Sequence, residues 1–462
     1  MFRKIIGNKN FYSLVLGVSM PIMIQNAVTC FVGLLDNIMV GQVGTLPMSG
    51  VSISNQLLTI YNLAIFGSVT AASLFGAQYA GRKDMEGIRN CFRFKLIIAV
   101  LVTLVGASIF LFLGPNLLSI FMDVNTNTPE QIATTMGYAH EYLILMLFGL
   151  LPFALAQAIG GTVREIGDTK LPMFSSIVAV GVNFVLNFVL IFGYLGFPKL
   201  GIVGAAIATV ISRFAELGVL IWGIYMNHSR YPFFDHVFDG FYVPMELTKQ
   251  IIVRGAPLVM NEVLWSIGCS LIMQCYSTRG LDGVAAYNIA ITVQSIFHTV
   301  CIGMGNTISI LVGQKLGAKD NEGAVDMNTK ITFLAFALCC VLGVVIYATS
   351  SLFPMLYNTS EAVRSVASGL LKVQAVFLPV VAVYNCCYFT MRSGGKTVIT
   401  FLFDSVFTCV VSLPVAFLLS RYTTLDLVTM FLLVQSVDLF KDALGLYLVK
   451  KRVWVHNLVV QA

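Results

Sequence analysis

The chain has 462 residues, of which 57% are hydrophobic and only 11% are charged, and its mean hydropathy is +0.86. These proportions exclude a water-soluble globular protein, and 13 Pro and 10 Cys over this length exclude a collagen-like repeat and a small disulfide scaffold. The net charge of +6 is interpreted as a signal of membrane topology, and no nucleic-acid partner is expected. The composition indicates an integral membrane protein.

Twelve apolar runs follow one another along the chain, each long enough to supply the roughly 20 residues that a helix needs to cross a bilayer. Backbone groups in lipid must be hydrogen-bonded within their own segment, so each run is predicted to be a helix and the fold to be all-α. The predicted spans are 12–40, 48–76, 94–114, 131–158, 172–194, 200–226, 250–277, 284–312, 328–353, 362–390, 397–419 and 426–449.

Lys and Arg are distributed unevenly between the loops on the two sides of the membrane. Twenty-one of the 28 Lys and Arg lie in the termini and the even-numbered loops, and three (Lys199, Arg279 and Arg421) lie on the opposite side. Loops that face the cytoplasm collect Lys and Arg. Both termini are therefore predicted to be cytoplasmic, with the chain in the inner membrane of the cell.

An internal repeat relates the two halves of the chain by a shift of 236 residues. Pro21 falls on Pro257, Gly44 on Gly280, Gln78 on Gln314, Gly81 on Gly317 and Asp84 on Asp320. Six is an even number of spans, so both halves enter the membrane from the same face and the repeat is parallel. We expect two six-helix bundles, an N-lobe at 1–226 and a C-lobe at 250–462, joined by a cytoplasmic linker at 227–249.

The duplicated prolines and the repeat itself suggest movement. Pro21 and Pro257 each lie inside the first span of a lobe, where proline removes a backbone hydrogen bond and kinks the helix. A static kink that improves packing is the alternative to a hinge. Carriers built from such repeats bind substrate near the midplane and expose it to one side at a time.

Acidic residues inside the spans are the main functional candidates, because a charge at bilayer depth is costly. Glu262 lies near the middle of the seventh span without a cation one turn away, and Asp36 lies in the outer part of the first span. A hydrogen bond to a neighbouring helix, or an interfacial position for Asp36, is the structural alternative. Asn183 and Asn187 share one helix face and offer amide oxygens either to an ion site or to another helix.

The remaining charges in the spans have neighbours on their own helices. Arg213 is three residues before Glu216, and Lys441 stands between Asp438 and Asp442 near the end of the last span. We expect ion pairs within each helix, with a cytoplasmic gate as the alternative. Asp404 has no evident partner, and its role stays open.

Taken in order, the motifs of the chain resemble those of the multidrug and toxic compound extrusion (MATE) family over essentially the whole length. They are Pro21 with Gln25, Leu35–Gly44, Ala77–Gly81, Arg164–Pro172, Asn183 with Asn187, Phe192 and Gly193, Gly204–Arg213, Gly255–Pro257, Val284–Asn288 and Met391–Gly395.

The resemblance implies secondary active antiport, in which a proton or Na⁺ enters while an organic, often cationic, compound leaves. It implies that Asp36 is the ion-coupling acid of the N-lobe, with Asn183, Asn187 and Thr209 around it, and that Glu262 is the acid of the C-lobe. Two positions depart from the family. Position 187 is Asn where many relatives have Asp, and the stretch 378–383 of the tenth span lacks the acid that some relatives carry.

Further expectations concern the substrate and its surroundings. The candidate substrate-cavity residues are Gln25, Asn261, Trp265, Asn288 and Gln294. We expect a proton rather than Na⁺ as the coupling ion, a small organic substrate, lipid around a monomer, no cofactor and no metal.

Four alternative functions are weighed against antiport. A channel is compatible with the sequence, but duplicated bundles with deep acids favour a carrier. A major-facilitator carrier also has twelve spans, but its loop motif has an Asp-Arg pair where Tyr79 and Ala80 stand here. A lipid-linked oligosaccharide flippase would have more deep Arg and Lys. A membrane enzyme would have a nucleophile and a base, or a metal pair, at depth, and His298 lacks such a partner in the sequence pattern.

Overall fold

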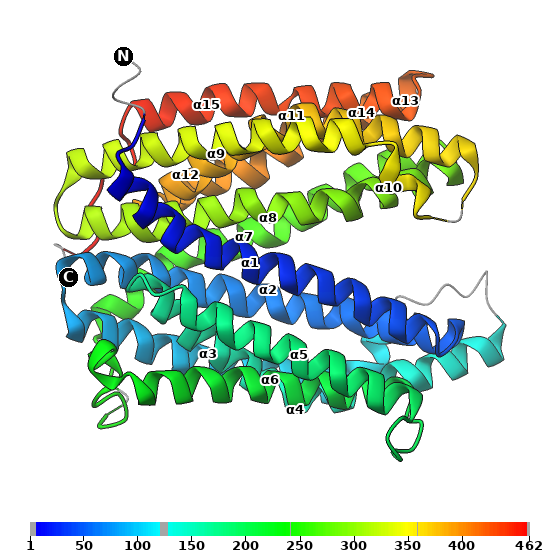
Figure 1. Ribbon diagram of the computed structural model, residues 1–462, viewed down its shortest axis with the longest axis horizontal. Helices are drawn as coiled ribbons and strands as arrows, with labels where there is room; N and C mark the ends of the chain where they lie inside the picture. The colour runs from blue at the N-terminus through cyan, green and yellow to red at the C-terminus, as the bar shows by residue number, and fades with distance from the viewer. Residues whose placement is uncertain (1–5, 121–127, 241, 358, 460–462) are drawn as a thin grey trace. The chain divides into compact units, whose positions relative to one another are not determined.

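The computed structural model describes residues 6–120, 128–240, 242–357 and 359–459 (Figure 1). All regular secondary structure in these residues is helical, which confirms the all-α prediction. The long helices are α1 (Lys9–Gly41), α2 (Thr45–Arg82), α3 (Met85–Ser119), α4 (Pro129–Glu165), α5 (Lys170–Phe192), α6 (Ile202–Met226), α7 (Met245–Ser277), α8 (Leu281–Gly317), α9 (Asn321–Thr349) and α11 (Glu361–Ser393). The 3₁₀ turns η2 (His228–Arg230) and η3 (Pro232–Phe234) follow α6, and the short helix α10 (Leu352–Met355) precedes α11.

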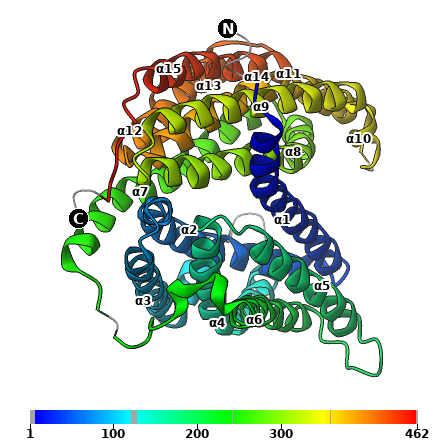
Figure 2. The same ribbon diagram turned by 60° about the vertical axis from the view of Figure 1, so that its left-hand side comes forward.

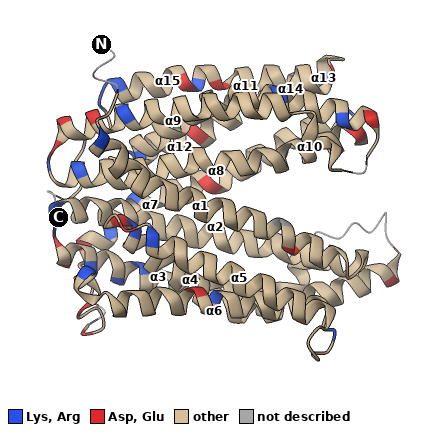
Figure 3. Ribbon diagram, viewed as in Figure 1, with Lys and Arg blue, Asp and Glu red and all other residues tan. Residues whose placement is uncertain are grey.

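Within the described residues, eleven helical stretches are long and apolar enough to cross a membrane. Most of them begin or end beyond the predicted spans, whereas α6 lies within 200–226. Where a helix is extended, polar residues can cap it outside the apolar run. At the start of α4, Thr128 accepts a hydrogen bond from the Gln131 backbone while the Gln131 side chain accepts one from the Thr128 backbone. Figure 3 shows that most of the helix length carries no charged residue.

The eleventh span, Thr397–Tyr422, departs from α-helical geometry in its middle. It starts as α12 (Thr397–Phe401), widens into two π-helical segments, η4 (Leu402–Val406) and η5 (Thr408–Ser412), and ends as α13 (Leu413–Tyr422). π-Helical turns interrupt the regular hydrogen-bond ladder and are frequent at functional sites. Asp404 lies within the first of these segments.

The predicted twelfth span is divided into α14 (Leu427–Ser436) and α15 (Asp438–Lys450). Val437 between them keeps right-handed helical dihedrals, with φ −62° and ψ −28°. Its N–H donates to the Val434 carbonyl, and its own carbonyl accepts from Phe440, both with 3₁₀ spacing. A tightened turn therefore interrupts this span, although the chain continues in the same helical sense.

The chain forms two compact units. The first, called here the N-lobe unit, comprises Ile24–Gly76 and Met85–Thr248. The second, called the C-lobe unit, comprises Met1–Met23, Ala77–Asp84 and Lys249–Ala462. Three helices, α1, α2 and α7, thus contribute to both units.

Each unit has its own apolar core. In the N-lobe unit, α6 packs beside both α4 and α5 (Figure 2), and Gly204 lies against the backbone of Leu190, which is how small residues let membrane helices approach closely. In the C-lobe unit, α11 packs beside α8 and α9, with buried residues such as Met304, Cys339 and Cys386 in a shared cluster.

Candidate functional site

The N-lobe unit brings the four residues of its expected ion site into contact. Asn187 Nδ2 donates to Asp36 Oδ1 at 2.6 Å and to Asn183 Oδ1 at 3.1 Å, and Asn183 Nδ2 donates to Thr209 Oγ1 at 3.3 Å. With the Asn183 amide turned over, its nitrogen lies 2.9 Å from Asp36 Oδ1 instead. In either orientation the carboxylate of Asp36 lies among neutral amides from α5.

Helix geometry explains how these side chains meet. Asn183 and Asn187 lie one turn apart on α5, and both are buried, whereas Asp36 on α1 is partly exposed. The Thr209 hydroxyl on α6 also donates to the Ala205 carbonyl one turn earlier. Tyr142 on α4 is hydrogen-bonded to Thr209 and completes the group, a contribution that the sequence pattern did not predict.

The chemistry of this group suits a small cation or a proton. A carboxylate with carboxamide and hydroxyl neighbours offers oxygen acceptors and no competing cation. The nearby Arg213 is occupied elsewhere, because its Nη1 donates to the Gly149 carbonyl at 3.2 Å and its guanidinium lies 4.9 Å from the Phe153 ring centre.

A second polar chain in the N-lobe unit contains Gln25, the first substrate-cavity candidate. Gln25 Nε2 donates to Ser176 Oγ at 2.7 Å, and Ser176 Oγ donates to Glu216 Oε1 at 2.7 Å. Arg164 Nη2 donates to Gln25 Oε1 at 3.2 Å. The direct contacts of Glu216 and Arg213 therefore run to other helices, and the predicted pair of these two residues within α6 is not among the described contacts.

One further ion pair in the N-lobe unit was also not predicted. The Lys95 ammonium bonds to the Glu165 carboxylate and donates to Thr162 Oγ1 at 3.1 Å. Both charged side chains are at least 96% buried. A fully enclosed pair with an additional hydroxyl partner is typical of a structural cross-link between helices.

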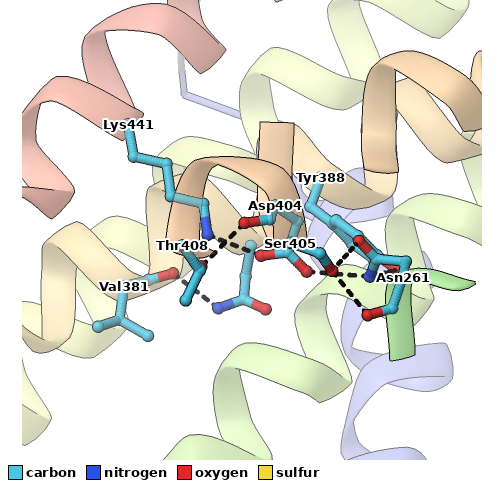
Figure 4. A network of polar contacts seen from close by, with 8 residues as sticks. Asn261, Val381, Tyr388, Asp404, Ser405, Thr408 and Lys441 are labelled. Carbon is cyan, nitrogen blue, oxygen red and sulfur yellow. Dashed lines mark hydrogen bonds and ion pairs between the residues drawn. The ribbon is translucent and has the colours of Figure 1, made fainter. Parts of the chain in front are cut away.

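In the C-lobe unit, Glu262 is hydrogen-bonded to Tyr388 of α11 and lies near Arg392 on the same helix. Its neighbour Asn261 is buried and donates to the Tyr388 hydroxyl at 3.3 Å. Asn261 Nδ2 also lies 3.0 Å from Asp404 Oδ2, and Ser405 Oγ donates to both oxygens of Asn261 (Figure 4). The two adjacent α7 residues thus belong to one interhelical network.

The same network contains an ion pair that the sequence pattern missed. Lys441 Nζ lies 2.7 Å from Asp404 Oδ1, and Figure 4 shows the lysine reaching from α15 to the π-helical segment. The prediction that Lys441 pairs directly with Asp438 and Asp442 within its own helix is wrong, because its direct partner lies on another helix. The sequence held one indication that Asp404 is a functional candidate: it is an acid inside a span without a partner on its own helix.

The remaining candidates lie at separate places in the C-lobe unit. Trp265 is 43% exposed on α7, and Asn288 lines a shallow surface hollow together with Thr292. Gln294 accepts a hydrogen bond from Gln374 Nε2 at 2.8 Å. The expected hinge prolines lie inside α1 and α7.

Comparison with known proteins relates most of the chain to one family. The family model described as MatE matches residues 21–189 and 257–418. "Probable multidrug resistance protein NorM" of Thermotoga maritima is 23% identical over 96% of this chain and 93% of its own length. The protein of the same name from Halalkalibacterium halodurans is 27% identical over 89% and 88%.

Solved structures agree at the level of the fold. A structure described as the "Outward-facing conformation of a multidrug resistance MATE family transporter of the MOP superfamily" superimposes with a TM-score of 0.86. It is 20% identical to this chain, and the match covers 97% of each.

Proposed function

Because the chain belongs to the multidrug and toxic compound extrusion (MATE) family, a family of multi-pass membrane transporters, we propose that it is a secondary active antiporter. It exports organic, cationic compounds and takes up a proton in return. A proton is preferred over Na⁺ because the Asp36 group has a single carboxylate, with Asn at position 187 in place of a second one.

The contact between Asp36 and Asn187 carries the proposal. A carboxylate held among amides at helix depth attracts a cation, and a proton that binds the same oxygen cancels the charge. Proton and organic cation therefore compete for one site. Such competition couples the two fluxes without any further chemistry, because each ligand weakens the binding of the other.

Movement between the two open states needs a helix that bends. The boundary between the two units within α1 falls after Met23, two residues beyond Pro21. Proline removes one hydrogen bond of the helix at this place, which supports Pro21 as a hinge for α1. Pro257 inside α7 is proposed as its counterpart in the C-lobe unit.

The orientation follows from charge. We propose that both termini face the cytoplasm, that the chain works as a monomer in the inner membrane, and that lipid surrounds it. Large apolar side chains such as Phe112 and Phe148, which are 82% and 69% exposed, suit contact with lipid.

The decisive experiment is transport by purified protein in liposomes. Ethidium or tetraphenylphosphonium is loaded inside, a pH gradient is imposed with and without Na⁺, and the movement of dye and protons is recorded. Wild type is expected to exchange protons for the cation, and Asp36→Asn to lose at least tenfold in rate. Thr29→Ser, a conservative change seven residues before Asp36 on α1, serves as the control.

Two outcomes would contradict the proposal. If wild type moved neither compound under a proton or Na⁺ gradient, antiport of organic cations would be wrong. If Asp36→Asn transported as fast as wild type, Asp36 would be structural. Flipping of a fluorescent lipid-linked saccharide by wild type would instead favour the flippase alternative.

A further inference from the structure

The Asp404–Lys441 pair differs from an ordinary structural ion pair in how its cation is held. Among the described contacts, Asp404 is the one ion-pair partner of Lys441 Nζ. Aromatic faces also lie beside it, with Nζ 4.6 Å from the Tyr384 ring centre and 5.6 Å from that of Phe403. The carboxyl groups of Asp438 and Asp442 on α15 interact with it electrostatically without a direct ion pair among the described contacts. Lys95 in the N-lobe unit, by contrast, has both a carboxylate and a hydroxyl partner.

The carboxylate of the pair is preorganised and more accessible than the ammonium. Its second oxygen accepts from Asn261 Nδ2 at 3.0 Å, and Asn261 is fixed in turn by Ser405 (Figure 4). The Asp404 side chain is 15% exposed, whereas that of Lys441 is 5% exposed. A cation that approaches from the exposed side therefore reaches the carboxylate before it meets the lysine.

Both helices that carry the pair depart from regular α-helical geometry close to it. Asp404 lies in the π-helical segment η4, and Lys441 lies one turn after the tightened turn at Val437. A 3₁₀ turn in the middle of a helix often marks a hinge, and π-helical segments are frequent at functional sites. The two charges can thus separate without unfolding either helix.

From these observations we propose that Asp404 and Lys441 form a cation–proton exchange pair in the C-lobe unit. An organic cation that binds the Asp404 carboxylate displaces the Lys441 ammonium. The displaced ammonium gives one proton to water and becomes a neutral amine, so one positive charge enters as one leaves. In the reverse step a proton from water recharges Lys441, which recaptures Asp404 and expels the organic cation.

The physical reason for the proton loss lies in the surroundings of Lys441. An organic cation bound at Asp404 places a second positive charge beside the Lys441 ammonium, and loss of one proton from the ammonium removes the repulsion between them. A lysine suits this role because its ammonium can release a proton, whereas an arginine stays charged.

Other ionisable groups face the pair and set its balance of charge. They are Asp438 and Asp442 on α15, Cys269 and Glu262 on α7, and Tyr384, Tyr388 and Arg392 on α11. The carboxylates of this group outnumber its guanidinium, so the region favours cations over anions. The aromatic rings suit a flat or bulky organic cation.

This inference rests on the proposed function and adds its own site to it. The test uses full-length protein in detergent with a pH indicator in weak buffer, to which tetraphenylphosphonium, ethidium or NaCl alone is added. Asp36→Asn is the background, because Asp36 could exchange a proton as well. We expect the organic cations to release about one proton for each cation that binds at this site, and NaCl to release none.

The discriminating variant is Lys441→Arg in that background. It preserves the ion pair and hence the fold, but the guanidinium cannot give up a proton. We expect cation-linked proton release and cation affinity each to fall at least tenfold. Lys330→Arg, at the exposed Lys330–Asp326 pair of α9, is the matched control and should change neither.

A double variant, Asp404→Asn with Lys441→Gln, removes both charges of the ion pair, so that neither partner stays charged without the other, which guards against loss of folding. It should keep a cooperative thermal transition and lose the cation-linked proton release. If proton release and cation affinity were unchanged in Lys441→Arg, the exchange pair would be wrong. Transport by the wild type would still support the proposed function. A wild type that neither binds nor moves any of the probes would overturn both.

Discussion

Gly81 of α2 packs directly against the backbone of Gln314 of α8. A Cβ added at Gly81 would collide with the Gln314 carbonyl, and a Cβ added at Gly317 would collide with the Gln78 carbonyl. The two contacts join equivalent positions of the internal repeat, since a shift of 236 residues carries 78 onto 314 and 81 onto 317. The repeated Gln-x-x-Gly sequence therefore forms a reciprocal helix crossing in the C-lobe unit.

Substitution of either glycine should disrupt this crossing. Gly81→Ala and Gly317→Ala each place a methyl group against backbone that cannot rotate away, so each should lower the free energy of unfolding by at least about 1–3 kcal/mol. Thermal unfolding in detergent measures the loss. Gly17→Ala on α1, where an added Cβ meets no atom within 4 Å, is the control. Equal melting temperatures for all three variants would show that the crossing relaxes freely.

Membrane orientation gives a second prediction. A reporter fused after Ala462, or inserted beside Arg82 at the end of α2, should report the cytoplasm. One inserted at Leu195, an exposed residue between α5 and α6, should report the opposite side. The unequal distribution of Lys and Arg is the reason. An external signal from the C-terminal fusion would contradict the proposed orientation.

Glu262 provides a test of charge within the C-lobe network. Glu262→Gln keeps a hydrogen-bonding group toward Tyr388 and removes the negative charge, so the variant should fold and insert normally. Export of ethidium from intact cells should nevertheless fall at least tenfold, because the charge is what attracts a cation. Asp282→Asn, in the first turn of α8, is the control for loss of an acid outside the network. Full resistance in a normally expressed Glu262→Gln strain would assign the residue a structural role.

The sequence predicted those parts of the candidate sites that lie on one helix or in one motif. Asn183 and Asn187 are one turn apart, so their shared face follows from helical periodicity, and the motif resemblance added Asp36 and Thr209. Twelve apolar runs likewise predicted the helices, because the thickness of the bilayer fixes their length.

Pairings between helices could not be predicted in the same way. Lys441 has acids three residues before it and one residue after it, so periodicity favoured pairing within its helix. Its actual partner, Asp404, is 37 positions away and is brought close by the packing of α15 beside the π-helical segment. Backbone irregularities such as those at 402–412 and at Val437 have no signature in the hydrophobic pattern, since it reports burial and not hydrogen-bond register.

The C-terminal tail is fixed by polar contacts at the same crossing. Gln78 Nε2 donates to the carbonyls of Ser393 and His456, and the Leu458 N–H donates to Gln78 Oε1 at 2.7 Å. Trp454 is 1% exposed, so the tail also contributes apolar burial. A residue of the duplicated motif thus holds the end of the chain against α11.

The last prediction concerns the pH at which this tail detaches. Burial, together with the charges of Lys396 and Arg254, lowers the pKa of His456 below its ordinary value of about 6.5. The folded tail therefore favours neutral His456, and its attachment is fully stable above about pH 6.5 and weakens as the pH falls through the lowered pKa.

Hydrogen–deuterium exchange of residues 453–459, corrected for the intrinsic effect of pH, measures this attachment. Protection in wild type should fall between pH 7.5 and pH 5, by at most about tenfold for each pH unit because one proton is taken up. His456→Asn cannot be protonated, and it keeps the backbone carbonyl that accepts from Gln78, so its protection should be nearly constant over this range. Trp454→Ala should reduce protection at every pH, because it removes burial rather than a titrating group. If wild type and His456→Asn lost protection in parallel on acidification, a group other than His456 would control the tail.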